Sequence, residues 1–194
     1  MFVSPKMSNS TVDLLYKELI RAYSTAISFY LNNNPLYYAW SKHWKILQSN
    51  LEKTQLKVEQ LPINDADVAY TQNKGELLCF RWKDSERYIL KDVFVYVLCH
   101  ELTHQCFPSS FIGHQEPFPT LLCIITVAAF ELQLFDITKI PMETVYSNKQ
   151  ELLSRKSIKQ ELLIGIEELR RANPTEEQYY HKLVSYIFHK YNKN

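Results

Sequence analysis

The sequence predicts an α+β fold that is mostly helical, with a small β-sheet or hairpin before a central helix and further helices at both ends. Two observations lead to this prediction. Apolar residues recur at helical spacing over most of the chain, and only residues 68–82 place β-favouring side chains on both sides of a turn-prone centre. A chain of 194 residues is long enough for one domain with a sizeable core.

Composition divides the chain into three segments. Residues 1–60 are expected to form an N-terminal helical segment packed on the core. Residues 61–140 are expected to form the core itself, and residues 141–194, which are richer in charge, a C-terminal helical segment.

The N-terminal segment is predicted to contain two helices. Ser10, followed three residues later by Asp13, resembles a capping box, and apolar residues then continue at helical spacing to about Leu31. Asn34 as cap and Pro35 as first helical residue begin the second helix. The aromatic side chains of this second helix are expected to pack on the first.

The core segment begins with the only convincing β-pattern and continues with two helices. The stretch VAYTQNKGELLCFRW, residues 68–82, predicts two strands joined at QNKG. Helical spacing resumes at Asp92, and Pro108 is expected to end this helix because the residue before a proline avoids the α region. Residues 120–135 are apolar on nearly all sides, which predicts a helix buried in the middle of the fold.

Two helices are predicted in the C-terminal segment. The first runs from about Lys149 to Arg171. The second begins at Asn173 and Pro174, since asparagine is a good cap and proline suits the first helical position.

Charge and cysteine content limit the classes of partner and compartment. The formal net charge is +1, so the overall charge does not favour a nucleic-acid partner, which would need a local basic patch. The four cysteines form no CxxC pair and lie in apolar surroundings, which favours reduced thiols in an intracellular compartment. The first residues do not have the pattern of a signal peptide, and the longest apolar run, residues 121–130, is too short to span a membrane.

The stretch VLCHELTHQCFPSSFIGHQEPF, residues 97–118, carries the pattern expected of a metal site. On a helix, His100 and His104 project from the same face, close enough for both imidazoles to reach one ion. Glu101 lies beside that face, where its carboxylate can contact a metal-bound water without being a ligand. Burying these side chains without partners would be costly, which argues against histidines that bind nothing. Catalytic zinc needs a third protein ligand and an open position.

His114 is the preferred third ligand, because Gly113 gives the chain a flexible point at which to return to the site. Glu131, on the next predicted helix, and Glu116 remain alternatives. Cys106 would point away from the histidine face and is interpreted as a packing residue. No metal role is assigned to the three isolated histidines, His43, His181 and His189.

HELTH, followed by GHQEPF and preceded by YTQNKGELLCFR, resembles the SprT-like and WLM group of zincin metalloproteases, which includes members carried by large DNA viruses. The resemblance covers about residues 66–136, and Gln115 after the third histidine is nearer the SprT-like pattern. It implies a zincin-like core in which His100, His104 and His114 bind Zn²⁺ and Glu101 is the general base. It also implies that residues 76–81 form an edge strand along which an extended peptide binds.

These observations predict a zinc-dependent metallopeptidase acting on protein or peptide substrates. If the protein is viral, host cytoplasm or the virion is its expected location. Tyr146 is either a donor to the tetrahedral intermediate or a packing residue. One alternative is a non-catalytic zinc-containing structural or interaction protein. Another is a nucleic-acid-associated protease acting on DNA-bound proteins, which would use a basic face built from Lys156, Lys159, Arg170 and Arg171.

Overall fold

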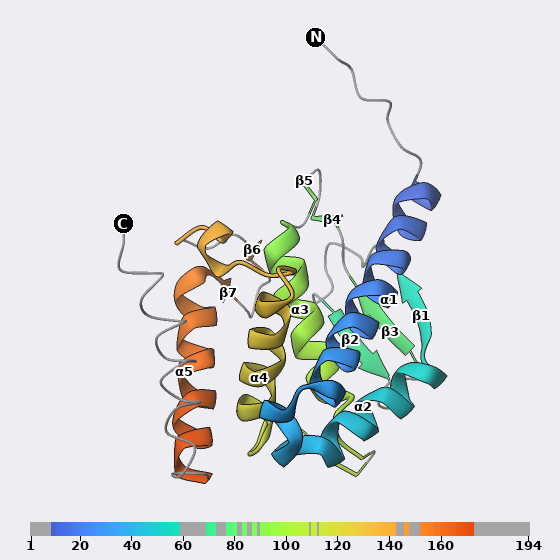
Figure 1. The fold of residues 1–194 in the computed structure, drawn as a ribbon. Coiled ribbons are helices and arrows are strands. Elements are labelled where there is room, and N and C mark those ends of the chain that lie inside the picture. Colours follow the sequence, from blue (N-terminus) through green and yellow to red (C-terminus); the bar gives the residue numbers. More distant parts are fainter. Residues whose placement is uncertain are drawn as a thin grey trace.

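The structure, a computed structural model, describes most of the chain between residues 9 and 172. The described residues are 9–58, 69–72, 77–80, 83–84, 87–88, 90–108, 110–111, 113–142, 146–147 and 152–172. The helix predicted to begin at Asn173 lies outside them. Within them the fold is mostly helical, with a small sheet (Figure 1).

The N-terminal segment forms α1 (Asn9–Asn33), the short 3-10 helix η1 (Pro35–Trp40) and α2 (Ser41–Lys53). Asn34 caps η1 as predicted, because its side chain accepts a hydrogen bond from the amide of Leu36 at 3.1 Å. The α-helical part begins later than predicted, at Ser41. The carbonyl of Tyr37 accepts the indole N–H of Trp44 at 2.9 Å, and the amide of Ser41 bonds instead to Tyr38, which keeps this turn in the tighter 3-10 form.

The main sheet has three strands, β1 (Gln55–Val58), β2 (Ala69–Gln72) and β3 (Leu77–Phe80), in the order β1-β3-β2. The predicted hairpin is present, since β2 and β3 pair antiparallel from Ala69↔Phe80 to Gln72↔Leu77. β1, which the sequence did not predict, pairs parallel with β3. The prediction that residues 76–81 form an edge strand is therefore wrong: β3 is the central strand, and β1 and β2 are the edges.

Two short antiparallel pairs complete the described strands. β4 (Lys83–Asp84) pairs with β5 (Arg87–Tyr88), and β6 (Tyr146–Ser147) pairs with β7 (Leu152–Leu153).

The two central helices are α3 (Lys91–His104) and α4 (Phe118–Glu131), followed by the short 3-10 helix η2 (Ile137–Lys139). α3 ends before Pro108, because the amide of Cys106 bonds to the carbonyl of Thr103 and closes a turn. α4 spans Phe118–Glu131 instead of residues 120–135. It ends where Gln133 adopts a left-handed conformation with φ of 59°, a common way for a helix to stop. As predicted, α4 is buried over most of its length.

The C-terminal helix α5 (Arg155–Ala172) packs along α4. It starts after β7, later than the predicted Lys149. The amide of Ser154 donates to Ser157 Oγ at 2.9 Å, and the amide of Ser157 donates to Ser154 Oγ at 3.1 Å, a reciprocal arrangement that caps the helix.

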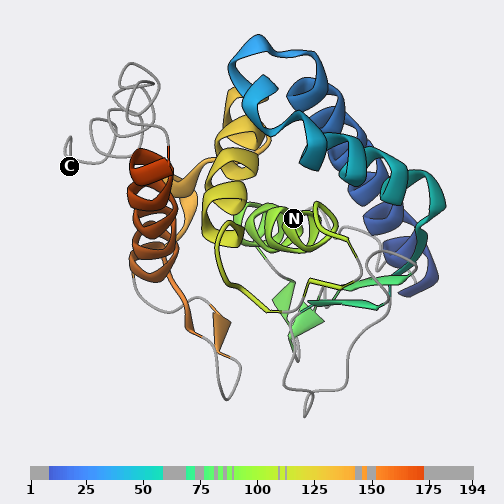
Figure 2. The same ribbon diagram turned by 90° about the horizontal axis from the view of Figure 1, so that it is seen from below.

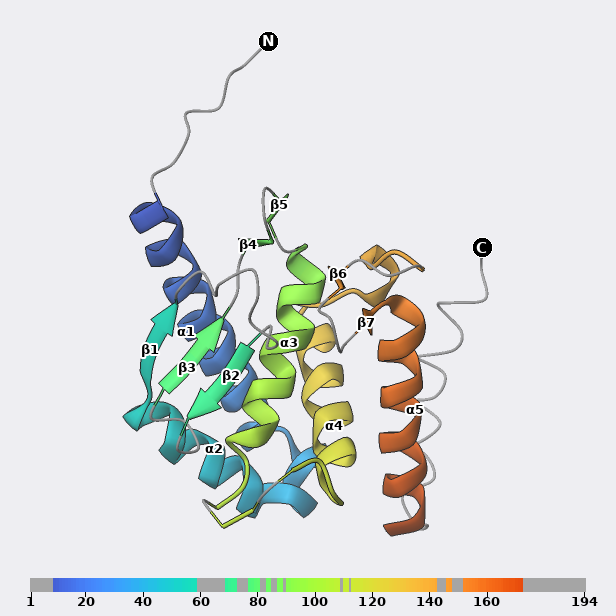
Figure 3. The same cartoon turned by 180° about the vertical axis from the view of Figure 1, so that it is seen from behind.

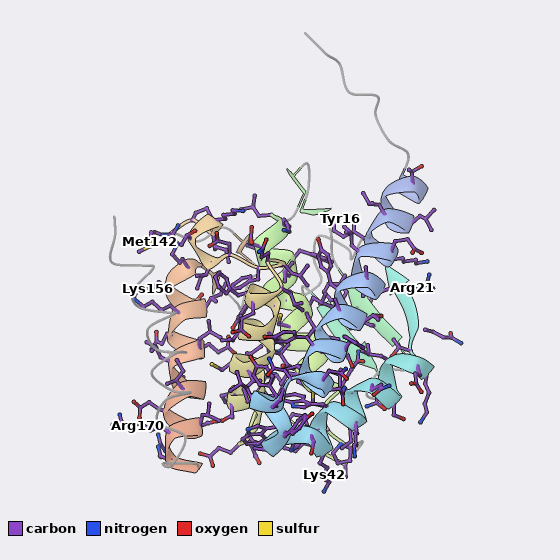
Figure 4. All side chains as sticks on the ribbon, viewed as in Figure 1. Tyr16, Arg21, Lys42, Met142, Lys156 and Arg170 are labelled. Carbon is purple, nitrogen blue, oxygen red and sulfur yellow. The ribbon has the colours of Figure 1, made fainter. Side chains whose placement is uncertain are left out.

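The elements are arranged around α3 and α4. Seen from below, α1 and α2 lie on one side of this pair and α5 lies on the other (Figure 2). The view from behind shows the three-stranded sheet beside α3, with β2 the strand nearest to it (Figure 3). Charged side chains such as Arg21, Lys42 and Lys156 point outward, while the spaces between the helices are filled (Figure 4). This packing places the start of α4 next to the end of α3.

Candidate metal centre

α3 carries the first two histidines at its C-terminal end. His100 and His104 are one helical turn apart, and their ring centroids are 5.0 Å from each other. Both are half-buried. The sequence therefore places a pair of imidazoles on one helical face, as predicted.

His114 reaches this pair from the segment between the two central helices, residues 105–117, which we call the ligand loop. The ring centroid of His114 lies 4.9 Å from that of His100 and 4.9 Å from that of His104. The loop can turn back at Gly113, whose φ of 86° favours glycine. The predicted triad of histidines is thus brought together, although its members come from a helix and a loop.

The nitrogen atoms of the three rings have a spacing that a single metal ion can occupy. One donor nitrogen from each histidine can be chosen so that all three lie within 4.8 Å of one another. Nε2 of His104 and Nε2 of His114 are 3.1 Å apart. Two imidazole nitrogens bound to one tetrahedral zinc ion are separated by about 3.3 Å. The three histidines therefore form a group that could hold a metal ion.

Phe118, the first residue of α4, forms one wall of this group. Its ring centroid lies 5.1, 4.6 and 4.5 Å from those of His100, His104 and His114. The side chain is buried, so it closes one side of the group to water. The sequence motif contained this phenylalanine four residues after His114, but its role becomes visible only when both helices are in place.

The surroundings of His100 favour a neutral imidazole, which is the form that binds metals. Burial of the ring, followed by the neighbouring His104 and His114, lowers the pKa of His100 to about 3. A protonated ring would be poorly solvated there and would lie close to two further imidazoles.

Glu101 lies on α3 between the two helical histidines and is buried. It is not one of the three residues whose donor atoms form the metal-binding group. Its place next to His100 in the sequence is the one predicted for a residue that acts beside the metal ligands.

The alternative ligands lie elsewhere or face other partners. Glu131 is the last residue of α4, roughly 20 Å along the helix from Phe118 at about 1.5 Å per residue, and it accepts hydrogen bonds from Tyr30 and Tyr37. Glu116 is exposed in the ligand loop and is not part of the histidine group. The thiol of Cys106 donates to the carbonyl of Leu102 at 3.3 Å, in agreement with a packing role.

No other predicted residue is described as part of the histidine group. His43 bonds through Nδ1 to the carbonyl of Cys106 and is not part of the metal-binding group. His181 and His189 lie outside the described residues. The backbone of Tyr146 belongs to β6, but its side chain is not described. Lys156 and Arg170 project from the outward side of α5 (Figure 4).

The structure also describes the four cysteines and the apolar character of the helices. All four cysteines are free and buried. Burial raises the pKa of the Cys99 and Cys123 thiols to about 12. In the part of the chain that the structure describes, no helix combines the length and the apolar character needed to cross a membrane.

Comparison of the sequence and the structure with known proteins found no similar protein. No family model matches the chain, and neither a curated protein nor a solved structure is significantly similar to it.

Proposed function

We propose that this protein is a zinc-dependent metallopeptidase with a zincin-like core of the SprT-like and WLM kind. The observation that carries the proposal is the grouping of His100, His104 and His114, with Glu101 on the same helix beside them. Three imidazoles from protein leave an open position on a tetrahedral ion, which is the ligand set of catalytic zinc. Nitrogen donors of this kind suit zinc better than calcium or magnesium, which prefer oxygen.

The histidines and Glu101 have separate tasks in this proposal. His100, His104 and His114 hold the ion, and the lowered pKa of His100 supports a neutral imidazole at that ligand. When bound, zinc lowers the pKa of water to near 7 and polarises the carbonyl oxygen of the substrate. Glu101 accepts a proton at its carboxylate from the attacking water and passes it to the amine that leaves. Phe118 excludes bulk water from one side of the group.

The substrate is proposed to be an extended peptide that pairs with β2. Among the described strands, β2 pairs with β3 alone, and the peptide would form its main-chain hydrogen bonds along the other edge of β2. β2 is also the strand that packs against α3, which carries Glu101. This assignment replaces the edge strand expected from the sequence, because β3 has a partner on each side.

The experiment compares zinc content with cleavage for Glu101→Gln. This variant should retain zinc at the wild-type level, because Glu101 is not a ligand. It should cleave an unfolded protein substrate roughly a hundredfold to ten-thousandfold more slowly, the usual effect of removing a general base. Zinc is measured by elemental analysis of protein purified without chelator.

Glu116→Gln is the matched control, since Glu116 is an exposed glutamate in the ligand loop, and it should leave both quantities unchanged. Normal cleavage by Glu101→Gln would rule out the proposed mechanism. Wild-type protein that neither carries nor takes up zinc would rule out the metal. Zinc binding without cleavage by the wild type would favour the non-catalytic alternative.

A further inference from the structure

Two side chains of α2 hold the first two carbonyl groups after α3. His43 Nδ1 lies 3.0 Å from the carbonyl oxygen of Cys106, and Asn50 Nδ2 donates to the carbonyl oxygen of Gln105 at 2.8 Å. A carbonyl can only accept, so Nδ1 of His43 carries the proton. We call His43 and Asn50 the α2 clamp. The clamp bonds to the backbone of the ligand loop directly after His104.

The two carbonyls lie where a helix end needs partners. Gln105 and Cys106 follow the last turn of α3, and both residues are fully buried. Carbonyls at such a position lack intrahelical partners, and a buried carbonyl without a hydrogen bond is costly. The α2 clamp supplies these bonds and so fixes the direction in which the chain leaves α3.

Aromatic packing continues from the clamp to the histidines. The ring of His43 packs edge-on against Phe107, with centroids 5.5 Å apart. Phe107 stacks on Phe111 of the same loop at 3.9 Å and lies 6.2 Å from Phe118. Because Phe118 contacts all three histidine rings, the clamp and the metal-binding group share one packed cluster of rings.

α2 is connected to α4 through Tyr37 of η1. Trp44 and Leu47 are fully buried, and the indole N–H of Trp44 donates to the carbonyl of Tyr37. The hydroxyl of Tyr37 donates to Glu131 at the end of α4, the helix that begins with Phe118. The helix that carries the clamp is therefore connected to α4 through buried and half-buried side chains.

The position of His114 depends on the ligand loop more than the positions of the other two histidines do. His114 is exposed, and within the described residues its side chain contacts His100, His104 and Phe118. Its position therefore depends on the backbone of the ligand loop. We propose that His43 and Asn50 are positioning residues that hold this loop so that His114 stays within reach of the ion. The inference rests on the proposed zinc site and assigns the N-terminal helices a role in it.

The test measures how fast zinc leaves the protein. His43→Phe keeps a ring against Phe107 but removes the donor, whereas His43→Asn keeps an amide donor near the position of Nδ1. Asn50→Leu removes the second donor at similar size. We expect release of zinc to an excess of chelator to be on the order of tenfold faster for His43→Phe and Asn50→Leu. This is the smaller end of the effects seen when residues that orient metal ligands, without binding the metal, are replaced. His43→Asn should stay close to the wild type.

Asn32→Leu is the matched control. Asn32 donates to the carbonyls of Ser28 and Trp44 in the same N-terminal segment, and neither acceptor belongs to the ligand loop. It should leave zinc release unchanged. An equal acceleration by Asn32→Leu would show that any loss of stability in this segment has the same effect, and it would overturn the inference. Unchanged release from both His43→Phe and Asn50→Leu would overturn it as well.

A second measurement, on metal-free protein, separates this inference from the proposed function. Hydrogen exchange should become faster at the amides of Cys106, Phe111 and Phe118, whose hydrogen bonds close the ligand loop, in His43→Phe and Asn50→Leu but not in Asn32→Leu. Unchanged exchange would refute the clamp even if zinc binds. Failure of the wild type to bind zinc would instead refute the proposed function, while faster exchange in the two clamp variants would still support the clamp.

Discussion

The three histidines are supported unequally by the residues around them. His100 and His104 are half-buried on a regular helix, and burial together with the neighbouring rings keeps His100 neutral. His114 is exposed and stands on a loop. Phe118 contacts each of the three rings, so a single buried phenylalanine packs against histidines from two different parts of the backbone.

Replacement of His114 by alanine should weaken zinc binding and peptide cleavage together. Loss of one ligand from a site with three should reduce zinc affinity by more than about 100-fold. Replacing residues that only orient metal ligands reduces the affinity by up to about 100-fold, and a direct ligand should matter more. Glu131→Gln is the comparison, because Glu131 was the alternative ligand and the structure places it at the far end of α4. Competition with a zinc-sensitive dye measures both affinities. Loss of zinc from Glu131→Gln but not from His114→Ala would reverse the assignment.

The sheet shows how pairing between elements changes the expected substrate site. β1 is four residues long and follows α2 almost directly, so its sequence carries little strand signal. Once it pairs with β3, the central strand has a partner on each side, and β1 and β2 are the edges of the described sheet. β2 is therefore the strand proposed for the peptide. The same strand packs against α3.

Proline substitutions in β2 should separate peptide binding from folding. In an antiparallel strand, successive amides point alternately toward the partner and away from it, so Tyr70→Pro and Thr71→Pro remove one donor of each kind. We expect one variant to lose stability because a bond to β3 is lost. The other should keep its fold and zinc but cleave peptides poorly, since the missing donor faces the substrate.

Urea unfolding, zinc content and cleavage rate identify which proline variant is which. Normal cleavage by the folded variant would exclude β2 as the substrate strand. Peptides methylated at successive backbone nitrogens give an independent test, because each methyl group removes one donor of the substrate.

In the whole molecule, α3 and α4 lie between the N-terminal helices and α5. α4 and α5 lie close together at Gly165, where an added Cβ would lie 2.2 Å from the carbonyl oxygen of Pro119 and 2.8 Å from Cβ of Cys123. Thr120 also donates to Glu168 across this interface at 3.1 Å. α5 therefore packs against the start of α4, which carries Phe118, on the side opposite the N-terminal helices.

Gly165→Ala should destabilise the protein although alanine is the better helix former. The contact with Pro119 involves backbone, so the helices must move apart, and overpacking of this kind costs about 1–3 kcal/mol. This cost should exceed the gain in helix propensity of about 1 kcal/mol. Urea unfolding measures the change. Glu167→Ala, on the exposed side of the same helix, should alter stability by about 0.5 kcal/mol or less, and a comparable loss there would contradict the packing explanation.

The sequence by itself determined the local features of this protein. Four-residue spacing places His100 and His104 on one face of a helix, the β-favouring flanks of QNKG produce a hairpin, and the apolar run after Phe118 produces a buried helix, because each depends on neighbouring residues. Only the tertiary structure decided that β3 is central, that Glu131 accepts from Tyr30 and Tyr37, and that His43 and Asn50 bond to carbonyls of the ligand loop. These features join residues that are far apart in the chain, and such contacts form only when whole elements pack together.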